Sequence, residues 1–245
     1  MATCLYCKRT EGPFTSREHC IPESIGNQGH GGKQEIVLPR GVVCDKCNHG
    51  VLSMLDRTLI DFMPISLMRT FYGVRSKSGK LPETKLSNAK LRMFAPGHVV
   101  LEPTSPKALV DRGNGRFDLN LLSNRKATPE QRRDVARALF KMTLGCMYID
   151  QPDVALSERF DPVRRMILGE VDFHGYVTMV ARAWVPTADN KRSGLYYDFL
   201  DVPGRKPTVW TRLDFWRTSL FTDLEARMPE KPTLLPGDKA EILEF

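Results

Sequence analysis

Hydrophobic residues recur at helical spacing just after Cys47. The recurring positions are Val51, Leu52, Leu55, Leu59 and Phe62. Residues three and four apart lie on one face of a helix, so this pattern predicts a helix with one apolar face. Pro64 is expected to end or kink this helix, because proline has no backbone N–H to donate.

A longer helix is predicted over residues 129–149. Thr128 suits the N-cap, Pro129 suits the first helical position, and Gln131 completes a capping box. The residues expected on its apolar face are Val135, Leu139, Met142, Cys146 and Ile149. A short helix is also predicted over residues 161–168, where a glycine follows.

Alternating apolar and polar residues predict strands in two regions. The first region holds three short candidates, namely Lys90–Phe94, His98–Leu101 and Arg116–Leu122. The second is an antiparallel sheet over about residues 173–213, formed by Phe173–Val185, Leu195–Val202 and Thr208–Leu213. The polar stretch before Lys90 is expected to be an exposed linker, and the Pro-rich stretch after Met228 is expected to lie on the surface.

These elements predict an α+β fold in two parts, residues 1–72 and residues 73–245. The chain has 245 residues, of which 41% are hydrophobic and 27% charged, as in ordinary globular proteins. No apolar run approaches the roughly 18 residues that a membrane crossing needs, so no membrane association is expected. The N-terminus has no signal-peptide core, which favours a cytoplasmic location.

The positive charge is concentrated in the middle of the chain. The formal net charge is +7, yet residues 1–60 carry seven basic and six acidic side chains. Residues 61–100 carry seven basic and two acidic side chains, whereas residues 151–245 carry 13 and 15. Such a segment is either a solvated connector or a surface that faces nucleic acid.

Four of the six cysteines form two C-x-x-C units. These are Cys4-Leu5-Tyr6-Cys7 and Cys44-Asp45-Lys46-Cys47. Two such turns supply the four soft ligands of a closed, structural zinc site. A redox dithiol is the alternative, but it would normally open a helix after a strand, and it does not explain two pairs. Cys146 lies outside this pattern and is expected to be a buried thiol.

The sequence between the two cysteine pairs resembles the HNH endonucleases that are braced by a four-cysteine zinc site. The residues that carry the resemblance are Glu18-His19, Ile21-Pro22-Glu23-Ser24, Gly26, Leu38-Pro39-Arg40-Gly41-Val42-Val43 and Cys44-x-x-Cys47-Asn48. The resemblance covers about residues 4–60. The middle Asn of the family motif has no counterpart directly before Cys44, and Asn27 is the remaining candidate.

The resemblance implies a ββα-metal module and a role for each matching residue. His19 would be the general base that deprotonates the attacking water, and Glu18 and Asn48 would bind a catalytic Mg²⁺ or Mn²⁺. His49 is a second candidate ligand for this cation. These types suit the chemistry, since His titrates near neutral pH and oxygen atoms bind hard cations. Residues 1–72 would then be a zinc-braced nuclease domain, and residues 73–245 an accessory domain with a basic connector.

The sequence therefore predicts a metal-dependent HNH endonuclease that hydrolyses phosphodiester bonds in DNA. A bacterial restriction, phage or defence setting is expected from the family alone. Basic residues expected to contact nucleic acid are Arg17, Arg40, Lys46, Arg69 and Arg75. The alternative is a zinc-containing nucleic-acid-binding protein whose HNH site is degenerate and not catalytic. Either a monomer that nicks or a homodimer that cuts both strands fits the sequence.

Overall fold

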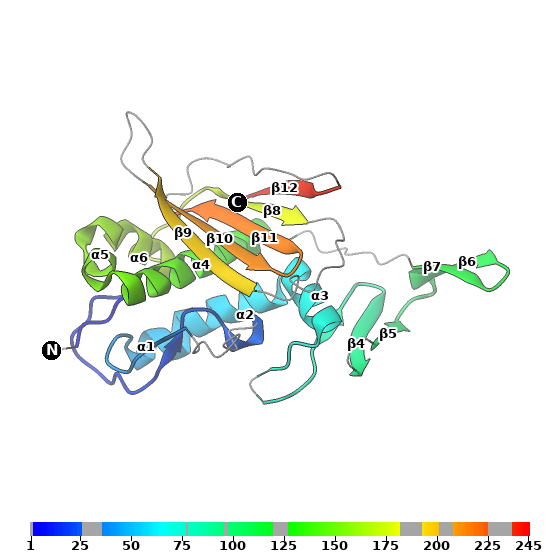
Figure 1. Cartoon of the computed structure of the whole chain (residues 1–245), viewed down its shortest axis with the longest axis horizontal. Coiled ribbons are helices and arrows are strands. Elements are labelled where there is room, and N and C mark those ends of the chain that lie inside the picture. Colours follow the sequence, from blue (N-terminus) through cyan, green and yellow to red (C-terminus); the bar gives the residue numbers. More distant parts are fainter. Residues whose placement is uncertain are drawn as a thin grey trace.

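The 22-residue helix α4 (Pro129–Asp150) is the central element in the computed structural model of the chain. The structure describes residues 2–25, 36–76, 78–95, 98–119, 127–181, 193–200, 208–224 and 237–245. α4 lies between a five-stranded sheet and helix α2 (Ser53–Asp61) (Figure 1). Its residues are therefore buried nearly all round from Val135 to Met147, whereas the sequence predicted one apolar face.

The predicted capping box at the start of α4 is confirmed. The Thr128 side chain accepts a hydrogen bond from the Gln131 amide at 3.2 Å, and the Gln131 side chain accepts one from the Thr128 amide at 3.1 Å. At the other end, Ile149 was expected on the apolar face but is 45% exposed. The expectation is therefore wrong for Ile149, which lies in the last turn of α4.

We expect Thr128→Ala to lower the free energy of unfolding by about 1 kcal/mol, because it leaves N-terminal amides of α4 without an acceptor. Urea denaturation followed by circular dichroism measures this change. Thr128→Ser is the matched control, since it keeps the hydroxyl acceptor. Equal losses for both variants would contradict the capping role.

The N-terminal segment contains a two-stranded antiparallel ribbon followed by a helix. Strand β1 (Glu18–His19) pairs with β2 (Val37–Leu38), with His19 opposite Val37. The elements that follow are α1 (Asp45–Cys47), the π-helical turn η3 (Asn48–Leu52), α2 and α3 (Met63–Tyr72), and η1 (Glu23–Ile25) lies between the strands. Pro64 lies in the first turn of α3, so the chain bends between α2 and α3 as predicted.

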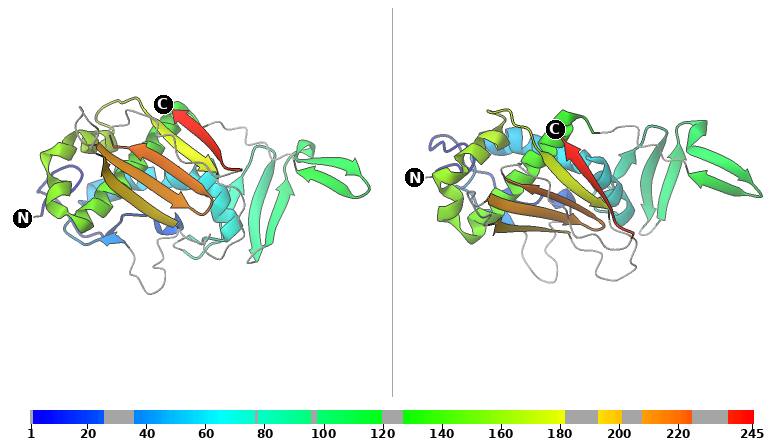
Figure 2. Two further views of the ribbon diagram at one scale, coloured as in Figure 1. Left: turned by 45° about the horizontal axis from the view of Figure 1, so that its top comes forward. Right: turned by 90° about the horizontal axis from the view of Figure 1, so that it is seen from above.

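Two small antiparallel sheets extend away from the body next to α3 (Figures 1 and 2). The first consists of β3 (Glu83–Lys85), β4 (Ala89–Ala95) and β5 (His98–Pro103), and the second of β6 (Leu109–Gly113) and β7 (Arg116–Leu119), with η4 (Pro106–Ala108) between them. The predicted linker before Lys90 is thus wrong in part, since it contains β3. Thr84 in this strand is buried, and its hydroxyl is satisfied by that of Thr70 on α3 at 2.7 Å.

The C-terminal region forms the large sheet and the short helices beside it. The sheet has the strand order β12-β8-β11-β10-β9 and all its pairs are antiparallel. Its strands are β8 (Tyr176–Ala181), β9 (Ser193–Leu200), β10 (Thr208–Phe215), β11 (Thr218–Asp223) and β12 (Lys239–Glu244), and the helices are α5 (Pro152–Leu156), η5 (Glu158–Phe160) and α6 (Asp161–Leu168).

The antiparallel sheet was predicted, but its extent was underestimated. Residues 239–244 do lie on the surface, since only Leu243 among them is buried, but they form the edge strand β12, which pairs with β8 along its whole length and was not predicted. β11 was also missed, although it forms a two-residue hairpin with β10.

Buried residues from both predicted parts of the chain form one contiguous core. Cys4 and Leu55 belong to it, as do Leu139 and Phe245. The fold class is α+β, while the boundary between residues 72 and 73 stays a prediction. Within the described residues, no helix combines the length and the apolar character that a membrane crossing requires.

Candidate metal centre and adjoining His19 site

The four cysteines of the two C-x-x-C units come together in space. Their Sγ atoms all lie within 4.8 Å of one another, and those of Cys7 and Cys44 are 3.7 Å apart. A tetrahedral zinc ion with Zn–S bonds of about 2.3 Å would place its sulfur atoms about 3.8 Å apart. The cluster therefore fits a metal ion such as zinc, which confirms the predicted group Cys4, Cys7, Cys44 and Cys47.

Backbone hydrogen bonds hold the two cysteine turns together. The Leu5 amide donates to the Val42 carbonyl at 2.9 Å, and the Cys44 amide donates to Cys4 Sγ at 3.4 Å. Lys8 has a left-handed backbone (φ 57°), which lets its amide return to the Cys4 carbonyl at 3.0 Å. These hydrogen bonds place the two pairs of cysteines next to each other.

The thiols differ in their affinity for protons. The Cys47 thiol and the amides around Cys4 stabilise a thiolate, which lowers the pKa of Cys4 to about 4. Burial raises the pKa of Cys7 to about 11, and the hydrogen bond with Cys4 raises that of Cys47. Because zinc binds thiolates, metal binding releases these protons, and the affinity for metal falls as the pH falls.

Side chains of α1 and η3, which follow Cys44, also hold the segment that leads into strand β1. The Asn48 side-chain nitrogen donates to the Arg17 carbonyl at 3.1 Å, and His49 Nε2 lies 3.0 Å from Ser16 Oγ. The Asp45 carboxylate accepts hydrogen bonds from the amides of Thr15 and Ser16, both at 3.0 Å. Asn48 and His49 are therefore brought next to the strand that carries the predicted base.

His19 forms a pair with a carboxylate that was not predicted as a site residue. Its Nε2 lies 2.9 Å from Glu23 Oε1, and about a quarter of each side chain is exposed. In the sequence, the only sign of this pair is that Glu23 follows His19 by four residues. In the structure, Glu23 begins the short helical turn η1. A carboxylate on one ring nitrogen fixes the orientation and tautomer of an imidazole.

Glu18 lies in a buried ionic cluster behind His19. Its carboxylate pairs with Lys141 of α4, and Lys141 Nζ also binds the two oxygens of Asp56 at 2.7 and 2.8 Å. Glu18 is 4% exposed and Lys141 is fully buried. Burial raises the pKa of Glu18 and of Asp56, while the nearby Lys141 opposes this rise. Burial alone would lower the pKa of Lys141, but Asp56 and Glu18 raise it above its usual value.

Glu18, a predicted ligand of Mg²⁺ or Mn²⁺, is already paired with Lys141. One oxygen of Glu18 binds Lys141, so Glu18 would have to share its carboxylate with a cation. In the described part of the chain, the four cysteines are the only group of three or more Cys, His, Asp and Glu side chains placed to hold a metal ion. The role of Glu18, Asn48 and His49 as ligands of a catalytic cation stays a prediction.

Four of the five basic residues expected to contact nucleic acid are exposed, and Arg69 is half-buried. Arg17, Arg40 and Lys46 are exposed around the cysteine turns and the ribbon. Arg69 is instead half-buried, and its Nε donates to the Ser24 carbonyl at 2.6 Å, so it ties α3 to the turn that carries Glu23. Arg75 is exposed and donates to the Gly79 carbonyl at 2.8 Å.

Gly26 and Asn27, which belong to the family resemblance, lie outside the described residues. In comparisons with known proteins, no family model, no curated protein and no solved structure matches this chain.

Proposed function

We propose that the chain is an HNH-type endonuclease that hydrolyses phosphodiester bonds, with DNA as its preferred substrate. One observation carries this proposal: an antiparallel ribbon that ends in His19 lies against a helix start that carries Asn48 and His49, and a four-cysteine cluster closes the unit. This arrangement has the order and the ligand type of a zinc-braced ββα-metal module.

His19 is the proposed general base. The Glu23 carboxylate lies 2.9 Å from Nε2 and orients the imidazole that takes a proton from the attacking water. The exposed Arg17, Arg40 and Lys46 are proposed to bind the phosphate backbone, and the products would carry 5′-phosphate and 3′-hydroxyl ends. No step is assigned to a divalent cation, although the resemblance implies Mg²⁺ or Mn²⁺.

A second candidate function is a zinc-containing nucleic-acid-binding protein without catalysis. The engagement of Glu18 by Lys141 favours it, because this pair withholds an oxygen that the family uses for the cation. The pairing of His19 with Glu23 favours the enzyme, because a binding module has no need of an oriented base.

We expect the wild type to cleave supercoiled plasmid DNA, and His19→Ala to slow cleavage by about 10²- to 10⁴-fold. The assay follows the conversion of supercoiled to open and linear plasmid with Mg²⁺, with Mn²⁺ or with excess chelator. The control variant His174→Ala changes an exposed histidine in the C-terminal region and should retain the wild-type rate.

A second readout separates the two candidate functions. Gel-shift binding of the same DNA by wild type and His19→Ala should be similar, since His19 acts on water. DNA binding without cutting under all three conditions would contradict the nuclease and favour the binding module.

A further inference from the structure

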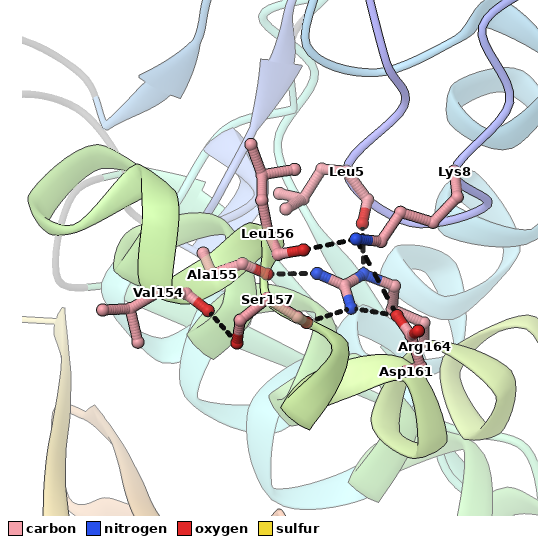
Figure 3. Close-up of polar contacts among 8 residues, drawn as sticks. All are labelled: Leu5, Lys8, Val154, Ala155, Leu156, Ser157, Asp161 and Arg164. Carbon is pink, nitrogen blue, oxygen red and sulfur yellow. Dashed lines mark hydrogen bonds and ion pairs between the residues drawn. The ribbon is translucent and has the colours of Figure 1, made fainter.

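Arg164 of helix α6 is buried at the contact between the C-terminal helices and the first cysteine turn. It is 2% exposed, and its guanidinium spreads over four oxygen atoms (Figure 3). The acceptors are the carbonyl of Leu5 at 2.7 Å, the carbonyl of Ser157 at 3.0 Å, the carboxylate of Asp161 at 2.6 Å and the carbonyl of Ala155. The planar fork of arginine suits this pattern, which the single ammonium of lysine cannot reproduce.

Both backbone polar groups of Leu5 are hydrogen-bonded. Leu5 lies between the ligands Cys4 and Cys7; its amide binds Val42, and its carbonyl binds Arg164. The far end of the same turn is held as well, because the Lys8 ammonium donates to the Leu156 carbonyl and lies 3.9 Å from Asp161 (Figure 3). Both ends of the turn that presents Cys4 and Cys7 are thus attached to residues 155–164.

The charges of this contact complement a metal–thiolate centre. A zinc ion with four thiolates carries a formal charge of about −2. Cys4 is fully buried, and a buried negative charge is costly unless cations or hydrogen-bond donors lie nearby. Arg164 and Lys8 bring two positive charges to this turn, of which Asp161 offsets one.

We propose that Arg164, together with Lys8, is an outer-shell anchor of the zinc site. The guanidinium holds the turn from Cys4 to Lys8 in its ligating shape and offsets the negative charge of the thiolates. Helices α5 and α6 are therefore part of the zinc-binding unit, although they lie more than 100 residues from the nearest ligand in sequence. This inference requires a metal at the four cysteines and does not depend on nuclease activity.

The first test measures zinc release from the purified, zinc-loaded full chain. A chromogenic chelator competes for the metal at neutral pH and low temperature, with the fold monitored by circular dichroism. We expect Arg164→Met to weaken zinc affinity about 10- to 100-fold, as is typical when an outer-shell partner of a metal ligand is lost. Arg164→Lys should give an intermediate loss, because it keeps the charge but not the fork.

Arg165→Met is the matched control, since Arg165 is the neighbouring arginine on the exposed face of α6. It should retain the wild-type zinc affinity. If Arg164→Met binds zinc as tightly as Arg165→Met, the proposal is overturned.

The second test needs no variant and so holds even where Arg164→Met does not fold. Hydrogen exchange of the wild type is compared with and without bound zinc. The proposal predicts that zinc removal increases exchange in residues 152–168 as well as in the turns that contain the cysteines, while β4 and β5 change little. Unchanged exchange in residues 152–168, with increased exchange at the cysteine turns, would overturn it.

Discussion

Replacing Lys141 by methionine is expected to lower the free energy of unfolding by about 3–5 kcal/mol, the usual result of breaking a buried ion pair from one side. Lys141 is fully buried and lies between Glu18 and Asp56. Methionine fills a similar volume but leaves two carboxylates near each other without a cation. Urea denaturation followed by circular dichroism measures the loss.

The matched control removes all three charges together. In the variant with Glu18→Gln, Asp56→Asn and Lys141→Met, no buried charge is left unpaired, so we expect most of the lost stability to return. If the triple variant were as unstable as Lys141→Met alone, the loss would come from packing, and the ionic account of this cluster would be wrong.

Replacing Cys44 by serine is expected to release the zinc and to unfold the N-terminal segment. Structural zinc in small zinc-finger peptides contributes apparent binding energies of about 10–16 kcal/mol, and this energy is coupled to folding. The Cys44 backbone amide also donates a hydrogen bond to Cys4 Sγ, which joins the two turns. Limited proteolysis should cut Cys44→Ser in its first 60 residues under conditions in which the wild type resists.

Cys146→Ser is the control for this prediction. Cys146 is a nearly buried thiol of α4 outside the cluster, as the sequence predicted. Its substitution should leave the zinc bound if the assignment of ligands is right, whereas zinc retention by Cys44→Ser would contradict that assignment.

Local patterns predicted the elements whose signals lie within a few residues of one another. The Thr128 capping box and the two C-x-x-C units are of this kind, because a turn or a cap is formed by neighbours in sequence. The ribbon of Glu18 and His19 with Val37 and Leu38 was predicted only through the family resemblance, since two residues per strand carry too little periodicity.

These local patterns could not predict contacts between residues that lie far apart in sequence. Lys141 is a charged residue among apolar residues of α4, and nothing near it in sequence identifies Glu18 as its partner. Arg164 likewise bonds to Leu5, which is far from it in sequence. β12 was missed because only one of its six residues, Leu243, is buried, so the strand lacks the alternation that marks a half-buried strand. Local sequence limits which elements form, whereas packing decides which charged groups meet.

The zinc-braced account of the N-terminal segment requires one bound metal ion. Elemental analysis of the purified full chain, combined with X-ray absorption at the zinc edge, tests this directly. We expect about one zinc per chain, bound by four sulfur atoms at about 2.3 Å. A protein that is folded after gentle purification yet contains no zinc, or zinc bound by nitrogen and oxygen atoms, would contradict the assignment of Cys4, Cys7, Cys44 and Cys47.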